Sequence, residues 1–352
     1  MSKFNKYNKL PSQKIVMKSG GGLGQQLFMY AMYRYWEEKG INVYVSVDEA
    51  FSHRWYFSFL EEDYYFRLPE YFSALKVNTI LRKDYYNDFF DPLNSKIKNL
   101  IKTRKLNILI KKICRKIKWK LFRINSNKSL GKIFIEEPWN RHEYFSDFSR
   151  ESNIFIERGY FVSYTVPYLL RDKLLKEIVF DKPLPESVLK ILAEIENTNS
   201  VSIHVRRRDY ITSKYYRDRG YVCTLQYYKN AIDFMAAHYS GLKYYIFTDD
   251  MEWVKNWFEF LGDYFLVDTS ELPLSAYYDM LLMSKCKHNI IANSTFSWWG
   301  AFFNENSAKT VVCPTDYRGY YIRADEVYPP EWIRVMTVIP PYIPAKYIYG
   351  KK

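Results

Sequence analysis

Short apolar strands alternate with helical stretches over the second half of the chain. Runs of β-branched and aromatic residues recur there, and apolar positions at three- and four-residue steps follow each run. The predicted strands are 201–205, 244–248, 264–267, 289–292 and 310–313, and the predicted helices are 225–238, 251–261, 273–284 and 294–304. Strands and helices in this order form a parallel sheet with helices on both faces. We therefore predict a doubly wound α/β domain here.

The same order appears near the N-terminus, with a glycine-rich turn in its first connection. A strand over 14–18 leads into the glycines of 20–24, and a helix to about residue 39 precedes a strand over 41–47. A long and less regular stretch separates this unit from the second half of the chain. We predict two Rossmann-like domains that face a cleft. Their predicted limits are 1–165 and 166–330, and a tail follows over 331–352.

The positive charge of the chain is concentrated in one segment. The net charge is +13, but residues 96–132 carry fourteen Lys and Arg and no acidic residue. The rest of the chain has 38 basic and 39 acidic residues and is close to neutral. Leucines and isoleucines recur at helical steps in the segment, which predicts a basic helical insertion in the first domain. A nucleic-acid-binding protein would spread its charge over a face with exposed aromatic residues, so we predict no nucleic-acid partner.

A helix with a dense row of cations fits an anionic membrane surface, where each cation adds about 1 kcal/mol of attraction. An inert, solvated helical hairpin is the alternative for residues 96–132. The first residues lack the apolar core of a signal peptide, and the four cysteines form no Cys-x-x-Cys pair. We therefore expect a cytoplasmic protein that docks peripherally on the inner face of the cytoplasmic membrane.

Three predicted strands of the second half end in residues suited to bind a nucleoside diphosphate. The arginines 206–208 follow the strand 201–205, and the pair 249–250 and the polar run 293–297 follow two others. In a parallel sheet these ends meet at one edge, where ligands bind. Arginine guanidinium groups form bidentate hydrogen bonds with phosphate oxygens, and N–H groups at a helix start bind anions. A solvated arginine run or a simple helix cap explains each feature alone, and their coincidence at one edge favours a site.

Four motifs occur in a specific order and spacing, and they are Gly21–Phe28, His204–Tyr210, Phe247–Asp250 and Asn293–Ala301. Together they resemble the alpha-1,2-fucosyltransferases of glycosyltransferase family 11 in its bacterial form. The resemblance implies a GT-B-like fold, with an acceptor-side N-terminal domain and a GDP-sugar-binding C-terminal domain. It also implies inverting transfer of fucose from GDP-β-L-fucose to the 2-hydroxyl of a galactoside, without a metal or other cofactor. Such a reaction would serve the synthesis of a surface glycan.

The resemblance assigns roles to the residues of the site. Arg206 matches the residue that holds the β-phosphate, with Arg207 in support. His204 and either Asp249 or Asp250 match positions that hold guanine or ribose. Asp209 is the nearest motif carboxylate to take the acceptor proton, and an ion pair with the arginines is its alternative role. The candidate catalytic residues are Arg206 and Asp209, and the candidate donor-binding residues are Gly22, Gly24, Gln25, His204, Arg206, Arg207, Asp249, Asp250, Asn293, Ser294, Thr295 and Ser297.

Two positions depart from the pattern of the family. Arg208 stands where glycine is usual, and Gln25 stands where asparagine is usual. The resemblance gives a galactose-terminated oligosaccharide or a lipid-linked glycan as the acceptor. The alternatives are a GDP-sugar-dependent transferase of another linkage and a basic protein that binds nucleic acid or a membrane.

Overall fold

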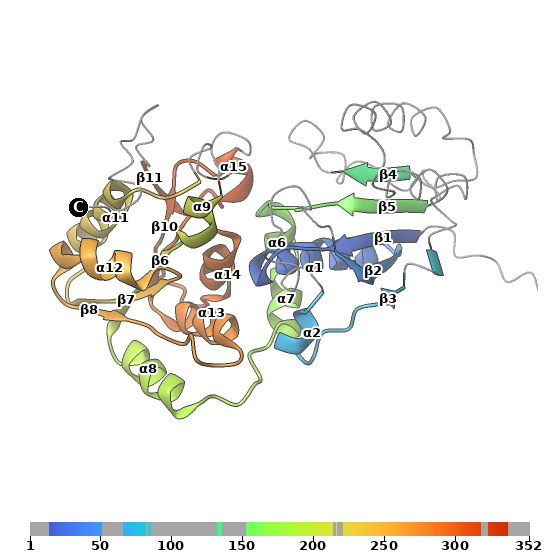
Figure 1. The fold of residues 1–352 in the computed structure, drawn as a ribbon. Coiled ribbons are helices and arrows are strands. Elements are labelled where there is room, and N and C mark those ends of the chain that lie inside the picture. The colour runs from blue at the N-terminus through green and yellow to red at the C-terminus, as the bar shows by residue number, and fades with distance from the viewer. Residues whose placement is uncertain are drawn as a thin grey trace, which may run out of the picture.

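The computed structural model describes residues 14–50, 66–81, 84–85, 132–135, 153–213, 216, 221–317 and 323–336. The predicted basic insertion lies outside these residues except for its last one, Lys132, so its helices stay a prediction. No helix within the described ranges is long and apolar enough to cross a bilayer. The described residues form two parallel sheets with helices between and around them (Figure 1).

The first sheet has the strand order β3-β2-β1-β5-β4, and its pairings are parallel. Its strands are β1 (Lys14–Ser19), β2 (Asn42–Ala50), β3 (Thr79–Ile80), β4 (Lys132–Ile135) and β5 (Asn153–Arg158). The glycine-rich turn after β1 leads into α1 (Leu23–Glu38), which buries most of its residues, and α2 (Leu68–Tyr71) precedes β3. The predicted β-loop-α-β unit at this end of the chain is confirmed.

The second sheet has the order β11-β10-β9-β6-β7-β8 and is also parallel. Its strands are β6 (Asn199–Val205), β7 (Leu242–Thr248), β8 (Tyr264–Leu266), β9 (His288–Ile290), β10 (Val311–Pro314) and β11 (Ile333–Val335). Its main helices are α11 (Leu225–His238), α12 (Met251–Trp257), α13 (Ser275–Lys285) and α14 (Thr295–Phe303), and two short ones are α9 (Arg208–Thr212) and α15 (Ala324–Val327). The two Rossmann-like domains of a GT-B-like fold are therefore present, as the sequence predicts.

Two details of the second domain differ from the sequence prediction. The helix expected over 251–261 ends at Trp257, because the chain bends at Phe258 into a short 3-10 turn that Gly262 closes at φ 72°. The expected tail from residue 331 begins with β11, which pairs with β10 and extends the sheet. A three-residue strand needs its neighbour to form, so local pattern alone does not predict it.

Three helices connect the two sheets: α6 (Thr165–Leu169), α7 (Arg171–Glu177) and α8 (Glu186–Glu196). In Figure 1, α6 and α7 lie beside α1, and α8 lies below the second sheet. Tyr168 of α6 also packs against Trp298 and Phe302 of α14. Because α6 contacts helices of both domains, the limit at residue 165 stays a prediction.

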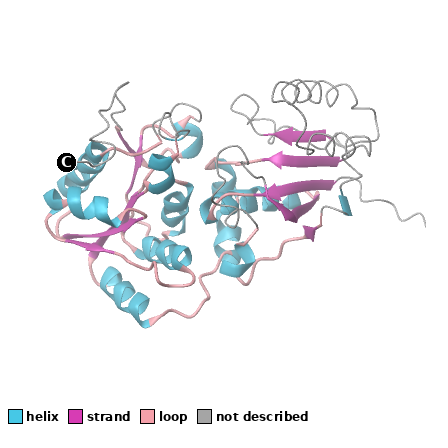
Figure 2. Ribbon diagram, in the orientation of Figure 1, coloured by secondary structure: helices cyan, strands magenta, loops and turns pink. Residues whose placement is uncertain are grey.

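The two domains meet where α1 packs against α14, between the sheets (Figure 2). The ring of Phe28 lies 4.7 Å from that of Trp298 and 5.2 Å from that of Trp299, and all three side chains are buried. The tryptophans thus belong to the core. A Cβ atom added to Gly24 would lie 2.6 Å from the backbone nitrogen of Phe296, so only glycine allows this approach.

Replacement of Gly24 by alanine is expected to loosen this interface. An alanine is a better helix former than glycine, but here its methyl group would collide with the backbone of α14. We expect a loss of about 1–3 kcal/mol in the free energy of unfolding, measured in denaturant. Gly22→Ala is the matched control, because nothing lies within 4 Å of its added methyl group and its φ of −69° suits alanine. Equal stability of the two variants would contradict the proposed packing constraint.

Candidate functional site

The predicted strand ends lie together at the carboxyl edge of the second sheet. β6 lies between β7 and β9, with Val205 opposite Thr248 and Ile203 opposite Ile290. The residues that follow these three strands are therefore neighbours in space. The Tyr210 hydroxyl after β6 donates to the backbone carbonyl of Asn293 after β9, over 3.1 Å, and joins two of the ends.

The Arg206 guanidinium is held between two carboxylates at this edge. Its Nη1 lies 2.6 Å from Asp249 Oδ2, and its Nη2 lies 2.5 Å from Asp209 Oδ1. The guanidinium also lies 5.6 Å from the ring centroid of Tyr210, and its side chain keeps about a third of its surface exposed (34%). A guanidinium has five N–H donors, and these two ion pairs leave others for a ligand.

Arg207 points into the protein instead. Its Nε donates to Asp250 Oδ2 over 2.9 Å, and its guanidinium lies 3.9 Å from the ring centroid of Trp253. The side chain is 3% exposed. Asp250 also caps α12, since its Oδ1 accepts from the backbone N–H of Trp253 over 3.1 Å. Arg207 therefore links the end of β6 to the end of β7 through its ion pair with Asp250.

Asp249 holds the backbone of the arginine run. Its Oδ1 accepts from the backbone N–H of Arg207 over 2.8 Å and from that of Arg208 over 3.3 Å. Its Oδ2 lies 2.6 Å from Arg206 Nη1 in an ion pair but has no hydrogen-bond partner among the described residues. Arg208, which stands where the family has glycine, is exposed at the start of α9.

His204 is a buried histidine beside this cluster. It is 6% exposed, and its ring lies 5.6 Å from that of Phe296. Burial, with the nearby charge of Arg206, lowers the pKa of His204 to about 3, so the ring is neutral at neutral pH. Its Nδ1 is buried and has no hydrogen-bond partner among the described residues. A buried polar atom of this kind is suited to a ligand.

The start of α14 forms the third side of the site. Ser294 caps the helix, because its Oγ accepts from the backbone N–H of Phe296 over 3.3 Å. The Ser297 hydroxyl donates to the carbonyl of Ser294, and the backbone N–H of Asn293 donates to Cys223 Sγ. Asn293, Ser294, Thr295 and Ser297 are all buried. The cap interpretation of Ser294 is confirmed, and the helix start is fixed by its own contacts.

The glycine turn of the first domain lies against the start of α14, but the Gln25 side chain contacts Tyr160. Gly21 has φ 77°, and the backbone at Gly24 touches that of Thr295. Gln25 Nε2 donates to the carbonyl of Tyr160 over 2.5 Å, and the side chain is 5% exposed. The structure thus places Gly24 at the site, while the amide of Gln25 holds the turn that follows β5.

Sequence reasoning missed the carboxyl of Asp279, a partly buried residue in the second turn of α13. Its Oδ1 accepts from Thr269 Oγ1 over 2.7 Å, just beyond the carboxyl end of β8. Burial raises the pKa of Asp279 to about 7, against the lowering effect of the Thr269 hydroxyl. A carboxyl with such a pKa near a ligand-binding edge is a candidate functional residue. The sequence signal is a lone acid in the apolar run of α13.

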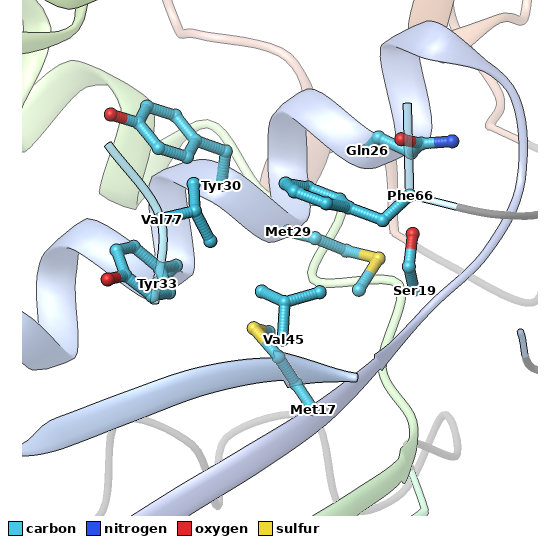
Figure 3. A pocket seen from close by; sticks show the side chains of 9 residues that line it. All are labelled: Met17, Ser19, Gln26, Met29, Tyr30, Tyr33, Val45, Phe66 and Val77. Atoms are coloured by element: carbon cyan, nitrogen blue, oxygen red, sulfur yellow. The ribbon is translucent and has the colours of Figure 1, made fainter. Parts of the chain in front are cut away.

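A separate cavity lies in the first domain, between α1 and the strands β1 and β2 (Figure 3). It is small, with a volume of about 10 Å³, and its lining is Met17, Ser19, Gln26, Met29, Tyr30, Tyr33, Val45, Phe66 and Val77. The buried hydroxyl of Ser19 has no partner among the described residues. None of the predicted site residues lines this cavity. The described ranges contain no cluster of three or more His, Cys, Asp or Glu side chains that could hold a metal ion.

Acid should destabilise the protein through His204. The folded-state pKa of about 3 lies below the ordinary value of 6.5, so between these values the unfolded chain binds a proton that the folded chain does not. This contribution to stability is present above pH 6.5 and is lost as the pH falls toward 3. Between pH 7.5 and 5, His204→Gln should lose about 2 kcal/mol less free energy of unfolding than the wild type. Equal losses would show that His204 is not held neutral.

A family model described as Glycosyl transferase family 11 matches residues 81–336, which is most of the chain. The chain is also similar to the O-antigen biosynthesis glycosyltransferase WbnK of Escherichia coli, with 44% identity over 119 residues that cover 34% of this chain and 39% of that protein. It is 32% identical to an Alpha-1,2-colitosyltransferase of Escherichia coli over 146 residues, which cover 40% of this chain and 49% of that protein.

A more distant relative is the Galactoside alpha-(1,2)-fucosyltransferase 1 of Saimiri boliviensis boliviensis, with 22% identity over 240 residues that cover 64% of this chain and 65% of that protein. The matches thus span less than two thirds of the length of these three relatives. Among solved structures, NodZ alpha-1,6-fucosyltransferase co-crystallized with GDP aligns with a TM-score of 0.45 and 16% identity over 82% of this chain and 92% of that one. By the family match, the chain belongs to glycosyltransferase family 11.

Proposed function

We propose that this chain transfers fucose from GDP-β-L-fucose to the 2-hydroxyl of a galactoside, with inversion at the anomeric carbon. Membership of family 11 and the printed name of the galactoside alpha-(1,2)-fucosyltransferase relative support the reaction class. The observation that carries the proposal is the fixed guanidinium of Arg206 at the edge where the start of α14 meets Gly24. This edge gathers the positive groups that a sugar diphosphate requires.

Arg206 would stabilise the departure of GDP. As the bond between fucose and the β-phosphate breaks, negative charge grows on the phosphate oxygens. Asp209 and Asp249 hold the guanidinium in place before the donor arrives, so no reorganisation is needed when the charge develops. The buried Arg207 keeps the strand ends fixed through Asp250.

His204 is the group that we assign to the nucleoside end of the donor. Asp249 is engaged by the Arg206 guanidinium and by the backbone N–H of Arg207, and Asp250 bonds to Arg207 and caps α12. The Nδ1 of His204 is buried without a partner among the described residues and can bond to the ribose or the guanine.

For Asp209 we propose the role of an arginine partner. It lies 2.5 Å from Arg206, and a general base must instead reach the acceptor hydroxyl within hydrogen-bond distance. The acceptor would be a galactose-terminated oligosaccharide or a lipid-linked glycan for the cell surface, an inference that the name of WbnK supports. A cytoplasmic location and docking of residues 96–132 on anionic lipid also stay predictions.

Removal of the Arg206 guanidinium should abolish transfer. A charge-assisted hydrogen bond contributes about 1.5–3 kcal/mol, so Arg206→Ala should weaken GDP binding by about tenfold or more and remove nearly all turnover. Arg206→Lys should also fail, because a point charge does not replace the bidentate fork. Isothermal titration with GDP, with circular dichroism as the folding control, checks this. Wild-type turnover by Arg206→Ala would overturn the assignment.

The donor is identified by a panel of ligands and by the linkage of the product. Thermal unfolding with GDP, UDP, ADP and GDP-fucose should show stabilisation by the two guanine nucleotides alone. Transfer to a galactoside should give a product linked at the 2-hydroxyl. The colitosyltransferase relative makes colitose the second sugar to test. Stabilisation by UDP or ADP and not by GDP would contradict the proposed donor.

Transfer should also survive chelation, since we propose that fixed arginines meet the charge of the leaving GDP in place of a metal ion. Turnover in EDTA should equal turnover in untreated enzyme when GDP is removed as it forms. Loss of transfer in EDTA that manganese or magnesium restores would show that a metal takes part.

A further inference from the structure

The helix α14 is held at both of its ends by the first domain and the connecting segment. At its start, Gly24 of α1 touches the backbone of Thr295 and Phe296. At its end, Arg171 of α7 donates from Nη1 to the carbonyl of Phe302 over 2.7 Å. The Arg171 guanidinium also lies 4.7 Å from the ring centroid of Phe302. The position of α14 is therefore held by contacts with α1 and α7 in addition to its contacts within the second domain.

A second cation shares the end of α14 with Arg171. Lys309 Nζ donates to the carbonyl of Ala301 over 2.9 Å and to that of Asn304 over 2.5 Å. Burial, with the charge of Arg171, lowers the pKa of Lys309 to about 8. Two cations that repel each other are thus kept on the carbonyl end of one helix. Such cations offset the negative end of the helix dipole.

The helix α7 that carries Arg171 is tied to α1. Glu177 Oε2 accepts from the Tyr30 hydroxyl over 2.7 Å, and Glu177 Oε1 lies 3.0 Å from Arg34 Nη2. Lys173 forms an ion pair with Glu38 at the end of α1. The helix α7 therefore connects α1 with the far end of α14 through Arg171.

We propose that Arg171 is a positioning residue for the donor site. It holds α14 so that the start of the helix at Thr295 stays at the edge where Arg206 lies, although Arg171 itself is at the opposite end of the helix. This inference rests on the proposed function only in naming GDP as the ligand. A change at Arg171 alters nucleotide affinity because a displaced helix start no longer meets the phosphate oxygens at hydrogen-bond distance.

The test compares Arg171→Gln and Arg171→Lys with Lys190→Gln. Lys190 is an exposed cation of α8 whose ion pair is with Glu186 in the same helix, so it serves as the matched control. GDP dissociation constants are measured by titration at a temperature well below unfolding, together with the donor KM and kcat. We expect Arg171→Gln to weaken GDP binding and raise the donor KM by about tenfold, as the loss of one charge-assisted hydrogen bond would. Arg171→Lys should recover part of the affinity, and Lys190→Gln should match the wild type.

A role in stability alone gives a different result. In that case Arg171→Gln lowers the unfolding temperature but keeps the wild-type GDP dissociation constant, and the proposal is overturned. If Arg171→Gln does not fold, Arg171→Lys decides, and a wild-type dissociation constant in that variant overturns the proposal equally. If the wild type binds UDP or ADP and not GDP, the proposed donor is wrong, and the same variants are measured with the nucleotide that binds. If the wild type binds none of the three, both proposals fail.

Discussion

The contact between Gly24 and the backbone of α14 is the constraint on which the candidate site depends. It brings the starts of two helices, α1 and α14, against each other, with 2.6 Å between an added Cβ and the nitrogen of Phe296. Each helix start carries partial positive charge, so their approach is unfavourable until an anion lies near both. Phe28, Trp298 and Trp299 supply the apolar burial that holds the helices together without it. Hydrophobic packing thus maintains an arrangement whose electrostatics favour a phosphate group.

The charged side chains at the sheet edge are also held in place before a ligand binds. Arg206 and Arg207 form ion pairs with Asp209, Asp249 and Asp250, and the exposed Arg208 beside them brings the formal charge of the cluster to zero. The two paired arginines nevertheless differ in exposure. Arg207 is buried against Trp253, while Arg206 keeps part of its surface exposed. Carboxylates that accept some of the hydrogen bonds of each guanidinium keep that guanidinium from turning toward other acceptors. The cluster is therefore rigid before a ligand binds, which is the condition for stabilising charge in a transition state.

The sequence predicts those features that local pattern controls. The helix α11 runs from Leu225 to His238 as predicted, because Thr224 caps it and its apolar residues keep helical spacing. The strand ends meet as predicted because parallel strands share one carboxyl edge. Contacts between distant residues were out of reach: Gln25 and Tyr160 are 135 positions apart, and Asp279 is recognisable only once its burial is known. The clamp of Arg171 on Phe302 likewise depends on how two domains pack.

The clamp on α14 also bears on how the two domains can move. Domains joined by a small polar interface are free to rotate, whereas an apolar interface resists rotation. Here aromatic rings of α1, α6 and α14 interlock, and hydrogen bonds to Phe302 and Asn304 fix the far end of α14. A rotation of one sheet against the other would have to break the contacts at both ends of α14, with Gly24 and with Arg171. The start of α14, which we propose to bind the phosphates, is therefore held in place before a donor binds.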